Sequence, residues 1–387
     1  MYKIQRICKV NKTLLRRLSY GILGIKEESF KEKYHYRSGS SYHTCSVNFN
    51  SRAKYRTTAN IPIASGTINY SAADLNIIAI TVDGKSVDTI PEGNYELTDA
   101  SYCIVDGEDT QLTINWDNET KALSVTPFTT KGTKCYLSFE EVIILDISLA
   151  NIEISEGSTS DKLYISGGGL SEQIEIDNTK QITIRGATET NGITINSGSA
   201  NITLNNVNIN SSYGTLRLLN SSVVNLTIEG TNTLDASNGN SIVTTGTGLY
   251  VNKDAKITID GSGILNSTGQ GSGIGAPYME PTGTIVINGG TINANSINNG
   301  AGIGGTAEAS ITGTIKINGG TVYAYGGGMS AGIGGGSPIS FECAPPNTAP
   351  NIYISKNADV TAIAGIIDAG DFTRPAEDIG NGGFSCW

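Results

Sequence analysis

A unit of 30 residues, built from short apolar pairs and many glycines, occurs twice in the second half of the chain. Residues 283–305 read GTIVINGGTINANSINNGAGIGG, and residues 313–336 read GTIKINGGTVYAYGGGMSAGIGGG. Apolar and polar residues alternate over only three to five positions, which is typical of short strands with one buried face. A fixed repeat of such strands predicts a solenoid.

Each unit predicts three strands separated by glycine-containing corners. In the second copy these strands are TIKI, TVYA and the short strand within AGIGG. The predicted inward-facing residues are Ile315, Ile317, Val322, Ala324 and Ile333. Glycine adopts the positive φ angles that sharp corners need, and Ile and Val stack well from coil to coil. Three strands per turn with sharp corners indicate a parallel β-helix, which we expect over residues 148–387.

Charge and turn signals divide the rest of the chain into two parts. Residues 1–60 contain 13 Lys/Arg and three Asp/Glu, although the whole chain has a net charge of −10. We expect this short basic N-terminal segment to serve attachment. Residues 61–147 alternate in hairpin fashion, as in IIAITVDGKSVDTI with its Asp83-Gly84 turn. They predict a small antiparallel β-sandwich.

Composition disfavours several classes of ligand. The body that follows residue 60 is acidic, so we expect no nucleic-acid partner, because binding phosphates needs clustered Lys/Arg. No run of about 20 apolar residues occurs, so we expect no membrane span. The two histidines and six cysteines lack metal-ligand spacing, and we expect no cofactor. Calcium binding stays open, although no motif supports it.

Cysteine usage and the N-terminus bear on location. Cys103 and Cys135 fall in the same predicted module and could form a disulfide in an exported protein, the alternative being two buried thiols. Residues 16–25, RRLSYGILGI, only weakly match a signal peptide, because KEE follows the short apolar run and no small-residue cleavage site appears. We expect an extracellular or cell-surface location, or a place in a virion, without a clear signal peptide.

Four patterns carry a resemblance to a known family. ITIDGSGIL, GTIVINGGTI, GTIKINGGTV and the AGIGG corners resemble the glycine-rich repeats of bacterial carbohydrate-binding-domain proteins, most clearly over residues 246–365. The resemblance implies a right-handed parallel β-helix of the polysaccharide-lyase type and a surface protein. WDNET at 116–120 and KCYLSF at 134–139 make the preceding module similar to small modules of Gram-positive surface and prophage tail proteins.

Residues 148–387 show no obvious catalytic cluster. Lyases on this fold need clustered aspartates and a basic residue, and glycosidases need paired carboxylates that face one groove. Here the carboxylates are scattered, and those in the most acidic stretch fall near turns, where Asp is common: Asp235, Asp254 and Asp260. Three arginines stand isolated: Arg185, Arg217 and Arg374. A non-catalytic protein is favoured, and an enzyme stays open.

Outward-facing positions of the repeat supply candidate ligand contacts. If Val322 and Ala324 point inward, Tyr323 and Tyr325 point outward. Sugar rings bind where an aromatic face lies beside amide hydrogen-bond partners. The candidate carbohydrate-binding residues are Tyr323, Tyr325, Asn293, Asn295, Lys316 and Tyr353. The alternative is an ordinary strand surface, on which Tyr is favoured anyway.

Three functions are therefore open. The first is a non-catalytic glycan-binding or adhesion protein of a bacterial surface or of a phage tail or fibre, with a polysaccharide or cell-surface glycan as partner. The second is a polysaccharide lyase or glycoside hydrolase on a β-helix. The third is a structural spacer of a virion or a surface. A homo-oligomer is compatible with each of the three.

Overall fold

The structure of the protein is a computed structural model that describes residues 31–38, 41–48, 59–64, 67–68, 75–105, 113–117, 122–126, 133–212, 214–238, 246–307, 313–337, 351–366 and 373–385. Within these residues the regular elements are all strands. The chain divides into two compact units, Met1–Thr57 and Thr58–Trp387. In the first unit, β1 (Lys31–Ser38) pairs antiparallel with β2 (Ser41–Asn48). Most of the predicted basic segment 1–60 lies outside the described residues.

The second unit begins with a module of two sheets. One sheet contains β5 (Leu75–Val82), β6 (Lys85–Val87), β7 (Tyr95–Leu97), β8 (Tyr102–Val105) and β11 (Thr133–Asp146), and the other contains β3 (Ala59–Ala64), β4 (Thr67–Ile68), β9 (Thr113–Asp117) and β10 (Ala122–Thr126). Leu123, Leu137 and Phe139 are buried in their shared core. The ring of Phe139 packs edge-on against Trp116, with the ring centroids 5.1 Å apart. The two sheets therefore enclose one small hydrophobic core.

The prediction that this module is antiparallel throughout is wrong for its longest pair of strands. β5 and β11 run parallel, from Thr133 opposite Leu75 to Phe139 opposite Val82. The predicted hairpin at Asp83-Gly84 is confirmed: β5 and β6 pair antiparallel, and the turn residues have φ angles of 49° and 72°. On its other side β11 pairs antiparallel with β8. There Cys103 and Cys135 lie directly opposite each other and form a disulfide.

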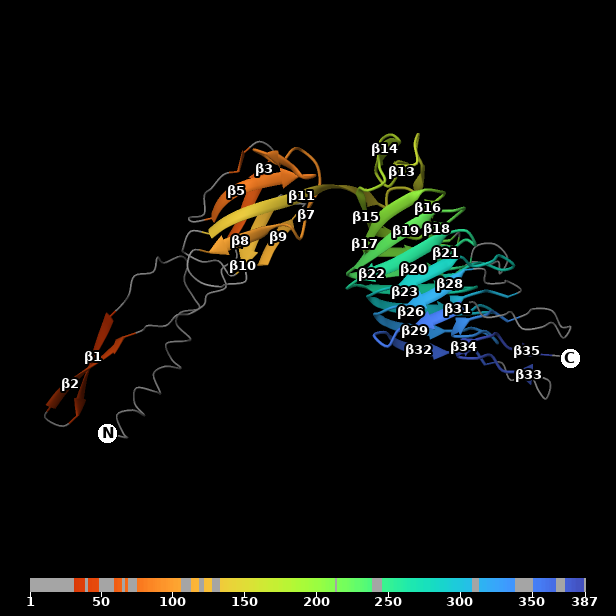
Figure 1. Ribbon diagram of the computed structural model, residues 1–387. Coiled ribbons are helices and arrows are strands. Elements are labelled where there is room, and N and C mark those ends of the chain that lie inside the picture. The colour runs from red at the N-terminus through yellow and green to blue at the C-terminus, as the bar shows by residue number, and fades with distance from the viewer. Residues whose placement is uncertain are drawn as a thin grey trace. The chain divides into compact units, whose positions relative to one another are not determined.

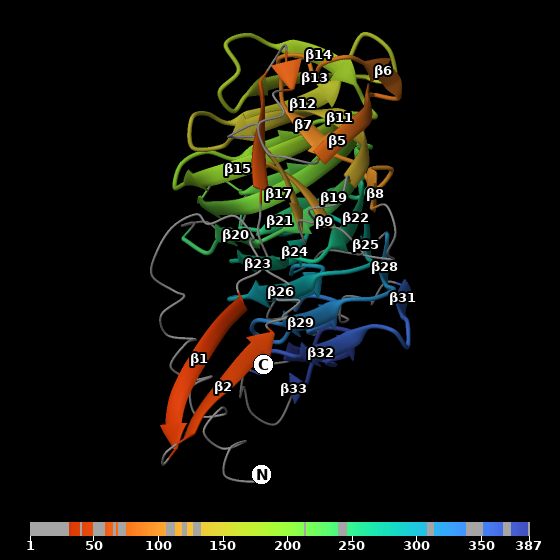
Figure 2. The ribbon, with the colours of Figure 1, turned by 90° about the vertical axis from the view of Figure 1, so that its left-hand side faces the viewer.

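The rest of the second unit is a parallel β-solenoid with three stacks of strands. Sheet 1 contains the end of β11, β15 (Gln181–Thr188), β17 (Ser199–Asn210), β19 (Val223–Glu229), β22 (Lys256–Gly261), β25 (Thr284–Ile287), β28 (Thr314–Ile317) and β31 (Asn351–Ile354). Sheet 2 contains the second half of β17, β20 (Thr231–Ala236), β23 (Ile264–Gly269), β26 (Thr291–Ser296), β29 (Thr321–Tyr325) and β32 (Asp359–Ile363). Figures 1 and 2 show these strands stacked in sequence order from β15 to β32.

Sheet 3 closes each coil with short strands. It contains β12 (Ile152–Glu156), β16 (Ile193–Ile195), β18 (Leu216–Leu218), β21 (Leu249–Val251), β24 (Ile274–Gly275), β27 (Ile303–Gly304), β30 (Ile333–Gly334) and β34 (Ile379–Gly380). The Ile-Gly corners lie in register, because Ile274, Ile303, Ile333 and Ile379 pair in succession. Beyond them, β33 (Thr373–Arg374) pairs antiparallel with β35 (Phe384–Ser385).

Inward-facing aliphatic side chains form one continuous core along the solenoid. All five predicted inward residues of the second repeat, Ile315 to Ile333, are completely buried. Each stacks on an equivalent residue of the neighbouring coil, as Ile315 does on Ile285. Removing this apolar surface from water, at roughly 25 cal/mol per Å², is the main stabilising contribution in so thin an interior. The alternating sequence pattern thus sets the buried face of every strand.

The corners between sheets 1 and 2 need a left-handed backbone. Gly290 and Gly320 occupy this corner in the two repeats, with φ angles of 78° and 81°. A side chain on Gly320 would lie 2.7 Å from the carbonyl oxygen of Gly290 in the coil before it. The NGG sequence therefore bends the chain and also lets successive bends stack closely.

The expectation of a parallel β-helix from residue 148 onward is wrong for one stretch near the beginning of the solenoid, where two strands are antiparallel. β13 (Lys162–Gly167) and β14 (Ile174–Asp177) continue sheet 3 beyond β12 as antiparallel strands. Their alternating leucine and isoleucine side chains pack in or against the solenoid core, as do those of the parallel coils. An irregular antiparallel extension at this end protects the sheet against further strand pairing.

Candidate functional site

The outward face of β29 presents two tyrosines, as the alternation predicts. Val322 and Ala324 are completely buried, whereas Tyr323 and Tyr325 are 37% and 40% exposed. The two tyrosines are two residues apart on one strand, so their Cα atoms are separated by about 7 Å along it. They lie on a sheet whose strands are held by pairing on both sides. The backbone therefore fixes the direction in which both side chains leave the strand.

Two of the predicted amide residues lie beside these tyrosines. In the parallel register Asn293 is opposite Tyr323 and Asn295 is opposite Tyr325, one coil away. The side-chain amide of Asn293 donates a hydrogen bond to the Asn266 side-chain oxygen at 2.7 Å. Four of the six candidate residues thus form one group, which we call the tyrosine surface: Tyr323, Tyr325, Asn293 and Asn295.

The other two candidates form a separate pair on sheet 1. Lys316 on β28 is directly opposite Tyr353 on β31, and Tyr353 is 57% exposed. The Asn318–Gly320 corner lies between this pair and the tyrosine surface. Among the described residues no hydrogen bond connects the two groups. The six candidate residues therefore fall into two groups on two sheets.

The aspartates considered for catalysis occupy turns and strand ends. Asp235 accepts a hydrogen bond from the backbone N–H of Ser237 at 2.8 Å, and Asp260 accepts one from Gly261 at 2.8 Å. Asp254 lies in the turn after β21. Short local bonds of this kind are typical of Asp residues that shape turns. Within the described part of the chain, no group of three His, Cys, Asp or Glu residues could hold a metal ion.

A pocket of about 210 Å³ opens on sheet 3, away from the strands that carry the tyrosine surface. Its base is formed by a column of outward residues in parallel register, in which Arg217 lies opposite Thr194 and Tyr250 lies opposite Arg217. In the next coil the same column continues as Gly275, which has no side chain. The segment between β24 and β25 supplies Pro277 and Glu280 to the pocket wall.

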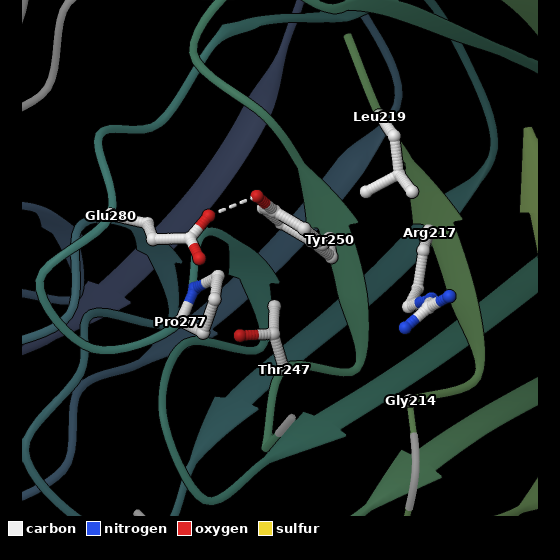
Figure 3. Close-up of a pocket in the computed structure, with 7 residues that line it drawn as sticks. All are labelled: Gly214, Arg217, Leu219, Thr247, Tyr250, Pro277 and Glu280. Carbon is white, nitrogen blue, oxygen red and sulfur yellow. Dashed lines mark hydrogen bonds between the residues drawn. The ribbon is translucent and has the colours of Figure 1, made fainter. Parts of the chain in front are cut away.

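Hydrogen bonds order the polar side of this pocket. The Tyr250 hydroxyl donates to the Glu280 carboxylate, and the Asn252 side-chain amide donates to the Tyr250 oxygen at 2.9 Å. Figure 3 shows Tyr250 between Glu280 on one side and Arg217 on the other. Burial, followed by the bond to Glu280, raises the pKa of Tyr250 to about 12. Tyr250 is therefore a neutral donor at physiological pH, and it holds one oxygen of Glu280.

The remaining lining residues contribute one buried hydroxyl and two apolar side chains. Thr247 is 2% exposed, and its hydroxyl has no hydrogen-bond partner among the described residues. Leu219, which follows β18, and Pro277 supply the apolar part of the wall. The pocket thus combines a guanidinium, a carboxylate, an unsatisfied hydroxyl and aliphatic carbon within a small volume.

Sequence reasoning missed this pocket. Arg217 was noted only as an isolated cation, and Tyr250 and Glu280 were not considered. Alignment of the LRL unit at 216–218 with the LYV unit at 249–251 would have placed Arg217 beside Tyr250, because both stand at the central position. The contribution of Glu280 has no such signal, since it comes from an irregular segment.

Comparisons with known proteins identify no relative of this chain. Searches against protein-family models, curated proteins and solved structures find no significant match to this chain. Among the described residues, no helix is long and apolar enough to cross a bilayer.

Proposed function

We propose that this chain is a non-catalytic glycan-binding protein that acts in adhesion at a bacterial surface or on a phage particle. Its partner would be a polysaccharide or a cell-surface glycan, held along the outside of the solenoid. The observation that carries the proposal is the tyrosine surface, where two exposed tyrosines and two asparagines lie in register on neighbouring strands.

The chemistry of this surface suits a sugar chain. One face of a pyranose ring is rich in C–H groups and packs on an aromatic ring, while its hydroxyls need hydrogen-bond partners at the edge. Tyr323 and Tyr325 offer the aromatic rings, and Asn293 and Asn295 offer amides one coil away. Because the strands are already ordered, binding would cost little conformational entropy.

A disulfide supports a location outside the cytoplasm, and the parallel connections support the handedness expected for the fold. The Cys103–Cys135 disulfide is of the kind that persists in oxidising surroundings. We infer a right-handed winding of the solenoid, because crossover connections between parallel strands of one sheet are right-handed in nearly all proteins. That winding agrees with the resemblance to the bacterial carbohydrate-binding-domain repeats.

A glycan array probed with the full chain tests the proposal. The double variant Tyr323→Ala/Tyr325→Ala should lose at least about tenfold in affinity for any glycan bound by the unmodified chain, because aromatic anchors dominate such contacts. Tyr102→Ala is the matched control, since Tyr102 is an exposed tyrosine of the sandwich module. Equal loss in both variants, or unchanged binding in the double variant, would remove the tyrosine surface as the site. Release of unsaturated sugar products during incubation would instead indicate a lyase.

A further inference from the structure

The pocket on sheet 3 contains a cation, Arg217, that has no anionic partner among the described residues. Arg217 donates one hydrogen bond, to the Thr194 hydroxyl at 3.2 Å. No carboxylate of the described residues comes within 4.0 Å of its guanidinium. A guanidinium has five N–H donors, so most of its capacity is free, and its planar shape matches a carboxylate or sulfate. The lining therefore lacks an anionic group next to Arg217.

The buried hydroxyl of Thr247 points to a ligand independently. A buried polar group without a partner costs free energy, and such groups are rare in folded proteins. Thr247 is almost completely buried, yet its hydroxyl is unsatisfied among the described residues and borders the pocket. The oxygen atom itself exposes less than 1 Å² to solvent, so a ligand hydroxyl would satisfy it once the threonine side chain rotates toward the pocket. The second carboxylate oxygen of Glu280, which accepts from no described residue, offers an acceptor to a second hydroxyl, because Tyr250 donates to the first.

We propose that this pocket binds a single anionic sugar unit, namely one pyranose ring with a carboxylate or sulfate. Arg217 holds the anionic group, Thr247 and Glu280 bind ring hydroxyls, and Leu219 and Pro277 cover the C–H face. The volume fits one ring, since it falls below the roughly 300–1,000 Å³ of sites for drug-sized ligands. Beside the Arg217 cation the pocket also presents the Glu280 carboxylate, which can accept from ring hydroxyls or from an ammonium, so binding of an amino acid is the competing outcome of the test.

This site is additional to the tyrosine surface and does not depend on it. The pocket residues belong to sheet 3 and to the segment after β24, whereas the tyrosines lie on sheet 2 in later coils. The same experiment can therefore include the Tyr323→Ala/Tyr325→Ala variant as a separate arm. Retained binding of small anionic sugars by that variant would leave the pocket standing even if the tyrosine surface binds nothing.

Calorimetric titration of the full chain with D-glucuronate, D-glucose 6-sulfate and D-glucose tests the charge requirement. The unmodified chain should bind at least one anionic sugar more tightly than glucose. Arg217→Met should weaken that binding by at least about tenfold, the usual worth of a charged hydrogen-bonded pair. Lys253→Met is the matched control, because it removes an exposed cation from the neighbouring coil, just after β21, without altering the lining. The D-glucuronate and 6-sulfate arms distinguish the two anionic groups.

The Thr247→Val variant separates a binding role from a structural one. Valine keeps the shape of threonine and removes the unsatisfied hydroxyl, so the ligand-free protein should be equally stable or more stable to heat while its affinity for the anionic sugar falls. The matched control is Thr215→Val, which removes a buried hydroxyl that donates to the Gly248 carbonyl and should lower the melting temperature. Both variants should keep the circular dichroism spectrum of the parent.

Three results would overturn the proposal. Heat of binding with L-alanine but with none of the sugars would assign the pocket to amino acids. Equal affinity for glucuronate and glucose would remove the role of Arg217. Absence of binding by the unmodified chain at millimolar concentrations of both anionic sugars would remove the site itself.

Discussion

Glycine is required in the central column of sheet 3 from Gly275 onward, whereas the preceding coils carry Arg217 and Tyr250 there. Gly275, Gly304, Gly334 and Gly380 pair in register, with φ angles between 137° and 155°. A Cβ atom on Gly304 would lie 2.1 Å from the carbonyl oxygen of Gly334 in the next coil. Both the backbone conformation and the spacing of the coils therefore exclude a side chain. The glycines of the AGIGG pattern therefore reflect this steric and conformational constraint and do not indicate a ligand site.

Substitution at this column should destabilise the protein strongly. Gly304→Ala combines a strained φ angle with a backbone clash, and we expect it to lower the free energy of unfolding by about 3 kcal/mol or more. Gly84→Ala provides a control in which φ is also positive, but no atom lies within 4 Å of the added methyl. It should cost only about 1 kcal/mol. Urea denaturation followed by circular dichroism measures both values, and equal costs would contradict the clash.

At the scale of residues, the sequence predicts the features that depend only on the local pattern of apolar and polar residues. Ile315, Ile317 and Val322 are inward because apolar and polar residues alternate, and that rule needs no knowledge of other coils. The separation of Lys316 and Tyr353 from the tyrosine surface was not predicted, because it depends on a corner between two strands. Alternation defines the two faces of one strand but not the direction in which the next strand turns.

At the scale of elements, β11 is shared between the two-sheet module and the solenoid. Its first half pairs with β5 and β8, and its last five residues, from Val142, pair with β15 of sheet 1. Lys180, just before β15, forms ion pairs with Asp83 at 2.5 Å and with Glu141 at 3.3 Å. Thr183 on β15 donates to Glu96 on β7 at 3.3 Å. These contacts connect the first solenoid coil to β7, to β11 and to the turn between β5 and β6.

This junction should weaken in acid. Burial opposes the ionisation of Asp83, but hydrogen bonds from Lys180 and from the Glu141 backbone outweigh it and lower the pKa of Asp83 below its usual 3.8. A lowered folded-state pKa means that the stabilisation is complete above the usual value and is lost as the pH falls through the lowered one. The melting temperature should therefore decrease below about pH 4.

Asp83→Asn tests this assignment, because asparagine also tolerates the positive φ of the turn. The variant should melt at a lower temperature than the parent at pH 7, and the difference should shrink toward pH 2. Asp88→Asn, at an exposed position of the same module, should follow the parent at every pH. A constant difference between the Asp83 variant and the parent from pH 7 to pH 2 would show that Asp83 contributes through the turn alone.

The pairing of β11 was not predictable from its own residues. KCYLSFEEVIIL reads as a strand, which is correct, but a strand pattern does not encode whether the partner runs parallel or antiparallel. The parallel neighbour β5 ends more than 50 residues earlier in the sequence. The antiparallel strands β13 and β14 were missed for a similar reason, since their I-x-I pattern equals that of the parallel coils.

At the scale of the molecule, the solenoid consists of coils that are nearly interchangeable. Ile285 and Ile287 lie over Ile315 and Ile317, and the second strands match equally well from Thr291 opposite Thr321. Each coil contacts its immediate neighbours, so stability is roughly a sum of coil and interface contributions. One coil could therefore be deleted, provided that the two coils on either side of it can pair directly with each other.

Deletion of Thr284–Gly313 tests this modular construction. It joins Gly283 to Thr314 and restores the GTI sequence at the junction. The shortened chain should keep its β circular dichroism spectrum, and its melting temperature should change by less than about 5 °C. Deletion of Thr284–Ser296 alone removes two strands of the coil and leaves the third, so it should unfold the adjoining coils. Equal disruption by both deletions would show that the coils are not equivalent.

The strand shared by module and solenoid has a mechanical consequence. If an attached glycan pulled on the solenoid while the module was tethered, tension would run lengthwise through β11. Hydrogen bonds flank this strand on both sides, and a lengthwise pull loads them in shear, so that many must rupture together and not one after another. The connection through β11 would therefore resist extension under tension, and the chain would begin to extend at another place.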